Sequence, residues 1–244
     1  MIQYSGISIE ATEIVATLKQ ELRLKEICQA ILYRQIIHRY AQEQNLVVSE
    51  AEIQQEADRQ RYERHLESAT ATYAWLQEQL ITMEEWEAGI RDRLLTQRLA
   101  ETRFAPEAEQ YFAEHRLQFE QVVLYQITVP YQQLSQELFY QIEESEISFY
   151  EAAHLYDMSA ERRLKCGYEG KIYRRYLNPN LAPLIFAATP GAVLGPLESP
   201  QGFDLLWVDD FINAEFTPET CQMIIQQLFQ EWLDRELTHW IHHS

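Results

Sequence analysis

Apolar residues recur at three- to five-residue intervals through the first hundred positions, the period of an amphipathic helix. Two capping-box sequences, Ser49-x-x-Glu52 and Thr82-x-x-Glu85, predict helix starts within this region, and residues 70–79 are typical of a shorter helix between them. We therefore expect an all-α lobe with antiparallel neighbouring helices. The stripe predicted to be buried carries Ile14, Leu18, Leu22, Ile27, Ile31, Ile36 and Tyr40.

Proline marks two further helix boundaries. Pro106 predicts that the helix opened by Thr82 ends at Ala105 and that a short new helix begins. Thr217-Pro218-Glu219 combines a cap, a proline suited to the first helical position and an acid in the first turn. The long apolar face that follows needs a partner, either a neighbouring sheet or the N-terminal helices. This face consists of Cys221, Ile224, Ile225, Leu228, Phe229, Trp232, Leu233, Leu237, Trp240 and Ile241.

The middle of the chain has a different pattern, with strands between helices. Residues 121–129 are rich in strand-forming residues and end at Pro130, and helices are expected over 133–145 and 148–156. Short apolar runs at 192–194 and 203–208 indicate strands of a small sheet.

Glycine and proline separate these elements. Gly167 and Gly170 suit a loop with left-handed backbone. Pro190-Gly191 and Gly195-Pro196 are both turn signals.

The order of these motifs resembles the parvulin (PpiC, rotamase) family of peptidyl-prolyl isomerases. The matching features are a helix ending at Tyr156, the glycine pair, Leu177-x-x-x-Leu181, Phe186, the two turn signals and Gly202-Phe203-Asp204. The phrases 32–37 and 45–53 also resemble the N-terminal chaperone lobe of SurA-type parvulins.

The resemblance implies an α+β fold in which a parvulin-like domain is inserted into an all-α SurA-like lobe. Residues 116–212 would form the inserted domain, with a four-stranded antiparallel sheet and surrounding helices. Residues 1–115 and 213–244 would form the discontinuous lobe, because in SurA-like proteins the C-terminal helix returns to complete it.

The family's two histidines on adjacent strands are replaced here. The phrase H-I-L-V reads Gln126-Ile-Thr-Val, and G-Y-H-I-I reads Gly-Phe-Asp204-Leu-Leu. Gln126 could still donate a hydrogen bond to Asp204 across the strands. The family's acid-or-thiol position corresponds to Ser159 or, counting from Gly167, to Ala160.

The implied proline pocket is better retained than the catalytic shell. Its substrate-binding side chains would be Leu177, Leu181, Phe186, Ser199 and Phe203. The resemblance thus predicts weak isomerase activity on extended, proline-containing or unfolded polypeptides. A non-catalytic SurA-like holdase and a dedicated partner of one secreted or modified peptide are the alternatives.

Composition limits the partners. A formal charge of −18 disfavours nucleic acid and anionic membrane surfaces, and no apolar run is long enough to cross a bilayer. Three widely spaced cysteines and a first segment without a signal-peptide pattern favour the cytoplasm. We expect no cofactor and no metal, since the His239-x-x-His242 pair lies at a terminus. The oligomeric state stays open.

A basic cluster interrupts this acidic chain. Solvated side chains or pairing with local acids is the expected explanation, with an acidic or phosphorylated client as the alternative. The cluster consists of Arg162, Arg163, Lys165, Lys171, Arg174 and Arg175.

Overall fold

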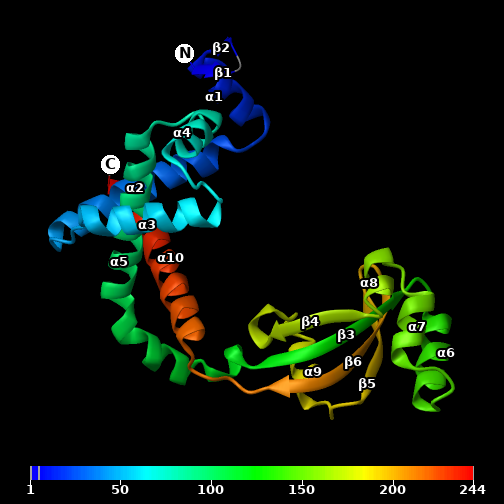
Figure 1. Ribbon diagram of the computed structural model, residues 1–244. Coiled ribbons are helices and arrows are strands. Elements are labelled where there is room, and N and C mark those ends of the chain that lie inside the picture. Colours follow the sequence, from blue (N-terminus) through cyan, green and yellow to red (C-terminus); the bar gives the residue numbers. More distant parts are fainter. Residues whose placement is uncertain (1, 5, 244) are drawn as a thin grey trace. The chain divides into compact units, whose positions relative to one another are not determined.

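The computed structural model describes residues 2–4 and 6–243, which fold into two compact units (Figure 1). The first unit comprises residues 1–108 and 221–244, and the second comprises residues 109–220. The inserted domain expected from the sequence, residues 116–212, is thus a few residues shorter at each end than the second unit. No helix within the described residues is long and apolar enough to cross a membrane.

The first unit is a helical lobe with a small strand pair at its beginning. The expectation of an all-α lobe is wrong there, because Ile2, Ile7 and Ile9 lie in a two-stranded antiparallel hairpin. The elements are β1 (Ile2–Tyr4), β2 (Ile7–Ile9), α1 (Ala11–Gln20), α2 (Leu24–Glu43), α3 (Glu50–Glu63), α4 (Ala69–Glu78), α5 (Met83–Glu114) and α10 (Pro218–His243). The last turns of α5 and the first residues of α10 belong to the second unit. Both predicted capping boxes form, at the starts of α3 and α5.

The predicted buried stripe is only partly correct. Leu22 has a φ of 59° between α1 and α2 and is 89% exposed, so the helical pattern breaks there. Ile27 and Ile31 are also exposed, whereas Ile36 and Ile37 are buried. The core of the lobe therefore begins in the second half of α2.

Pro106 does not end its helix, contrary to the sequence-based expectation. Helix α5 continues through it to Glu114. A proline inside a helix removes one backbone hydrogen bond and strains the preceding turn. Phe104 and Ala108 are both buried on either side of Pro106, and this packing holds the helix together.

The C-terminal helix α10 completes the helical lobe, which confirms that prediction. The Trp232 ring packs edge-on against Tyr40 with centroids 4.9 Å apart, and Phe229 contacts Phe104 at 6.3 Å. The Tyr40 hydroxyl also donates a hydrogen bond to Glu236 at 2.7 Å. The hydroxyl of Thr217 accepts from the backbone N–H of Thr220, as its predicted cap role requires.

The second unit is built on one antiparallel sheet in the order β4-β3-β6-β5 (Figure 1). Its elements are β3 (Gln121–Val129), α6 (Gln132–Glu143), α7 (Phe149–Tyr156), α8 (Ala160–Leu164), β4 (Tyr168–Tyr173), α9 (Ala182–Ala187), β5 (Val193–Ser199) and β6 (Gly202–Ile212). Short 3-10 turns occupy Arg116–Phe119 and Arg174–Tyr176.

The two faces of this sheet have separate cores. Helices α6 and α7 cover one face, where Leu138 and Phe149 pack on Ile127 and Leu205. The other face packs Val122, Leu124, Leu206 and Val208 against Ile185 of α9. Because side chains alternate along a strand, neighbouring residues of β3 belong to different cores.

Gly195-Pro196 is not a turn but an irregularity within β5, where the register with β6 shifts between Leu194 and Leu197. Gly195 has a φ of 134°, and a Cβ there would lie 2.7 Å from the backbone oxygen of Asp204. Only glycine therefore lets β5 approach β6 beside Asp204. Pro190-Gly191 does form a turn, with Gly191 at a φ of 88°.

Candidate functional site

The candidate site lies at one end of the sheet face that α9 covers. Thr128 of β3 is the direct cross-strand partner of Asp204 of β6, and Gln126 is paired with Leu206. Side chains two residues apart on a strand share a face, so Gln126 and Thr128 point the same way as Leu124. The strands thus place an amide, a hydroxyl and a carboxylate beside an apolar core.

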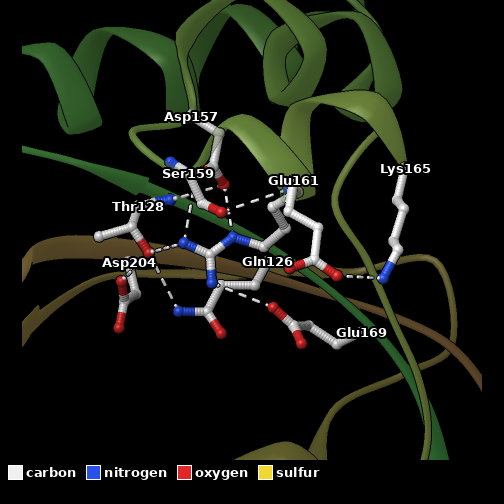
Figure 2. Close-up of polar contacts among 9 residues, drawn as sticks. Gln126, Thr128, Asp157, Ser159, Glu161, Lys165, Glu169 and Asp204 are labelled. Carbon is white, nitrogen blue, oxygen red and sulfur yellow. Dashed lines mark hydrogen bonds and ion pairs between the residues drawn. The ribbon is translucent and has the colours of Figure 1, made fainter.

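The hydroxyl of Thr128 connects these groups (Figure 2). It donates to Asp204 Oδ1 at 2.7 Å and accepts from Gln126 Nε2 at 3.1 Å and Arg162 Nη2 at 2.8 Å. A hydroxyl has one donor and two acceptor lone pairs, so its capacity is fully used. The direct bond expected between Gln126 and Asp204 does not form, because Thr128 stands between them.

A buried ion pair holds this hydroxyl in place. The Asp157 side chain is fully buried and accepts from Arg162 Nε at 2.7 Å and Nη2 at 3.1 Å. It also accepts from the backbone N–H groups of Thr128 at 3.2 Å and Ser159 at 2.7 Å. Asp157 therefore ties the loop after α7 to strand β3.

Arg162 is the hub of the network. Its Nη1 donates to Glu169 of β4 at 3.0 Å, so one guanidinium joins the loop after α7, β3 and β4. Burial by itself would lower the pKa of Arg162, but its hydrogen bonds with Asp157 and Glu169 outweigh burial and raise it. The guanidinium thus remains charged at any pH at which the protein is folded.

Ser159, the predicted acid-or-thiol position, has a structural role in this arrangement. Its Oγ accepts from the backbone N–H of Arg162 at 3.3 Å and caps α8. Ala160, the alternative position, is the first residue of that helix. Neither residue contacts Gln126 or Asp204 through a hydrogen bond among the described residues.

Three of the predicted pocket residues lie together on the site's face. Leu177, Leu181 and Phe186 are half-buried and pack against the core formed by Leu124 and Leu206. The Phe186 ring also stacks on Phe211 at 5.3 Å, and the Arg174 guanidinium lies 4.6 Å from its centroid. The first two leucines thus continue the apolar surface that borders Gln126.

The other two predicted pocket residues lie elsewhere. Phe203 packs with Ile127 and Leu205 on the opposite face, because it is adjacent to Asp204 in the strand. Ser199 is at the end of the β5–β6 hairpin, where its Oγ donates to the backbone oxygen of Gly202 at 3.3 Å.

Sequence reasoning missed the three residues that hold the site together: Thr128, Asp157 and Arg162. In the sequence Arg162 is only one member of a basic cluster. Two members of that cluster pair with local acids, as expected: Arg162 with Asp157 and Lys165 with Glu161. Arg174 pairs instead with Glu120, 54 residues away in the sequence.

Cys28, Cys166 and Cys221 are free thiols. Within residues 2–4 and 6–243, no three His, Cys, Asp or Glu side chains are grouped so that they could hold a metal ion. At the C-terminus the pairing is between Nδ1 atoms of His239 and His243, 2.9 Å apart, rather than between His239 and His242.

Comparisons with known proteins agree with this architecture. A sequence model of the rotamase family, described as the PPIC-type PPIASE domain, matches residues 128–210. No curated protein matches the sequence. The peptidylprolyl isomerase PrsA of Bacillus anthracis is 14% identical with a TM-score of 0.51, over 85% of this chain and 89% of PrsA.

Two other solved structures also match the chain. PrsA of Bacillus cereus is 13% identical with a TM-score of 0.46, over 98% of this chain and 87% of that protein. A PpiC-type peptidyl-prolyl cis-trans isomerase domain is 21% identical with a TM-score of 0.37, over 41% of this chain and 99% of the domain. The family match and the B. anthracis structure together show that this chain has the PrsA-like fold and that residues 128–210 are a parvulin-type rotamase domain.

Proposed function

We propose that the protein binds extended, proline-containing polypeptides and isomerises their prolyl bonds slowly, as a parvulin-type isomerase and chaperone. The observation that carries this proposal is a polar group, the Gln126 amide, which Thr128 holds opposite Leu206, on the sheet face whose apolar core Leu177 and Leu181 pack against. The match of residues 128–210 to the rotamase family supports it.

The chemistry required is rotation about an amide bond. Amide resonance opposes rotation with a barrier of about 18–20 kcal/mol. In the twisted state the prolyl nitrogen regains a lone pair, which can accept a hydrogen bond that the planar amide cannot. A site therefore accelerates rotation if it binds the twisted bond more tightly than the planar one.

Gln126 can supply such a hydrogen bond. Its side-chain amide has two N–H donors, and Thr128 accepts one of them. The second can point to the prolyl nitrogen while the leucines hold the proline ring. The Thr128 hydroxyl, saturated by its three bonds, orients the amide and does not itself contact substrate.

The same geometry explains why we expect slow turnover. The family's paired imidazoles are replaced by Gln126 and Asp204, and Asp204 already accepts from Thr128. One neutral donor is thus left to stabilise the transition state. A single preorganised donor is worth about a hundred- to a thousandfold in rate.

Replacing Gln126 by Leu tests this assignment. We expect Gln126→Leu to lower kcat/KM for a short Xaa-Pro peptide about a hundredfold, because the donor is lost. If the unaltered protein is slow, the variant would show no rate above the uncatalysed isomerisation. NMR exchange spectroscopy measures the rate, with Gln121→Leu, at the other end of the same strand, as the matched control. Equal rates for both variants and the unaltered protein would assign catalysis to other groups.

A specific feature of the helical lobe favours a second, chaperone activity. A groove of about 800 Å³ lies among α2, α5 and α10. Its apolar floor consists of Ile37, Ala100, Ile225, Phe229 and Leu233, all buried. This groove can take an apolar polypeptide segment independently of the prolyl site.

Glutamines along α10 suit an extended chain in that groove. Gln222, Gln226 and Gln230 line it at four-residue intervals, so their Cα atoms repeat about every 6 Å. Residues on one side of an extended peptide repeat at a similar interval, about 6.6–6.8 Å. Each amide offers both a donor and an acceptor to successive peptide groups.

Replacing Leu181 by Asp separates the two binding sites. We expect Leu181→Asp to weaken binding of a short Xaa-Pro peptide at least about tenfold, because a carboxylate would have to be desolvated beside the apolar core. Leu184→Asp is the control, since Leu184 lies three residues further along, in α9, and is 52% exposed. Isothermal titration gives both affinities. Unchanged affinity in Leu181→Asp would place peptide binding in the helical-lobe groove instead.

A further inference from the structure

A row of side chains crosses the face of the sheet opposite to the prolyl site. Val193 of β5 is paired with Trp207 of β6, Trp207 with Tyr125 of β3, and Tyr125 with Tyr168 of β4. The Tyr125 centroid lies 5.1 Å from Trp207 and 5.1 Å from Tyr168. Register partners share a face, so the row spans all four strands.

Helix α7 contributes the ring of Tyr150, which packs nearly perpendicular to two rings of this row. Tyr150 meets Trp207 at 5.0 Å and an interplanar angle of 88°, and meets Tyr125 at 5.2 Å and 83°. Tyr150 is 41% exposed and Tyr168 is 39% exposed. The aromatic surface is therefore partly open to solvent.

Beside these rings is a hollow of about 470 Å³. Phe149, Tyr150, Trp207 and Val193 line it, together with Ile142 of α6 and Ile147 of the α6–α7 connection. The hollow shares none of its lining residues with the prolyl site. It is thus an open hollow with both apolar and polar walls, separate from the prolyl site.

The charge around the hollow has one sign. Glu143, the last residue of α6, lines it, and the exposed Glu144 and Glu146 follow directly after the helix. None of its lining residues is Lys, Arg or His. Burial raises the pKa of Tyr150 to about 12, with further contributions from the charge and hydrogen bond of Tyr125 and, last, from the negative charge of Asp209.

We propose that this aromatic hollow, formed by Tyr150, Trp207 and the acidic segment 143–146, is a second polypeptide-binding site that takes a basic, arginine-containing segment. A guanidinium placed over the face of Tyr or Trp is attracted by the ring quadrupole. The glutamates supply the complementary charge at the rim. This site needs no proline and no isomerase activity.

Fluorine NMR of the full-length protein labelled with 5-fluorotryptophan tests the proposal. The chain has five tryptophans, and the resonance of Trp207 is assigned with a Trp207→Phe sample. The probe is the proline-free peptide acetyl-Arg-Gly-Arg-Gly-Arg-amide, and its matched control has citrulline at each arginine. We expect the arginine peptide to shift the Trp207 resonance saturably and the neutral peptide to bind at least about fivefold more weakly.

Variants distinguish this site from the prolyl site. We expect Tyr150→Ala to weaken binding of the arginine peptide about fivefold or more, whereas Tyr150→Phe keeps the ring and binds within about twofold. Leu181→Asp is expected to leave this binding unchanged. The proposal is overturned by an unmoved Trp207 resonance, by equal binding of the citrulline peptide, or by loss of binding in Leu181→Asp.

Discussion

Arg162→Met is expected to lower the free energy of unfolding of the second unit by about 3–5 kcal/mol. The Asp157 carboxylate is fully buried, and the guanidinium supplies two of its four hydrogen bonds. Methionine has a similar length but no charge and no donor. The variant would therefore leave an uncompensated carboxylate inside the protein, which is the costly way to break a buried ion pair.

Hydrogen exchange at the backbone amides of Ile127 and Leu205 measures this decrease in the free energy of unfolding, because both residues lie in the core of the second unit. Both side chains are fully buried in the centre of the sheet. Lys165→Met is the control, because both partners of its ion pair with Glu161 are exposed, so that its loss should change stability little.

Asp157→Asn combined with Arg162→Met checks the physical cause. An asparagine oxygen can still accept from the backbone N–H groups of Thr128 and Ser159, and no charge remains buried. We expect the double variant to be more stable than Arg162→Met alone. Equal destabilisation of the two would mean that lost packing, and not the buried charge, accounts for the effect.

Local signals predicted many of the elements correctly. The capping boxes at Ser49 and Thr82, the proline-led start of α10 and the strand over residues 121–129 depend on residues close in sequence. The predicted helix boundaries that were wrong lie where tertiary packing outweighs the local sequence signal. Phe104 and Ala108 hold α5 through Pro106, and Leu22 interrupts a stripe that looks continuous in the sequence.

The site was harder to predict because it depends on register. Gln126 and Asp204 could be found by resemblance, but which β3 residue faces Asp204 is decided by the pairing of two strands 76 residues apart. That residue is Thr128. The Asp157–Arg162 pair was missed for a similar reason, since the five-residue spacing across the start of α8 carries no helical signal. Phe203 lies on the opposite face of the sheet from Asp204, because successive side chains of a strand point to opposite faces.

Removing residues 217–244 is expected to abolish the cooperative unfolding of the helical lobe and to make the protein self-associate. Helix α10 buries Ile224, Ile225, Phe229, Trp232, Leu233 and Leu237 against the lobe. Without it, the partners of these side chains, among them Tyr40 and Phe104, would become exposed. Exposed apolar seams of this kind associate with one another.

A smaller change in the same helix measures what one side chain contributes. Trp232 is 3% exposed, contacts Tyr40 and Phe229, and has the Arg103 guanidinium 4.8 Å from its ring. Trp232→Ala should cost about 3–5 kcal/mol of stability. Trp232→Phe should cost less, because it keeps an aromatic ring and removes an indole Nε1 that has no hydrogen-bond partner among the described residues.

Size-exclusion chromatography with light scattering measures self-association. Circular dichroism during heating shows whether the helices unfold cooperatively. Deletion of residues 241–244 alone is the control, since Ile241 is 61% exposed and should contribute little. A chain ending at residue 216 that stays monomeric and keeps a cooperative helical transition would show that the N-terminal helices fold by themselves. Helix α10 would then be an accessory to the lobe, and the helical-lobe groove that it walls could not be a built-in binding site.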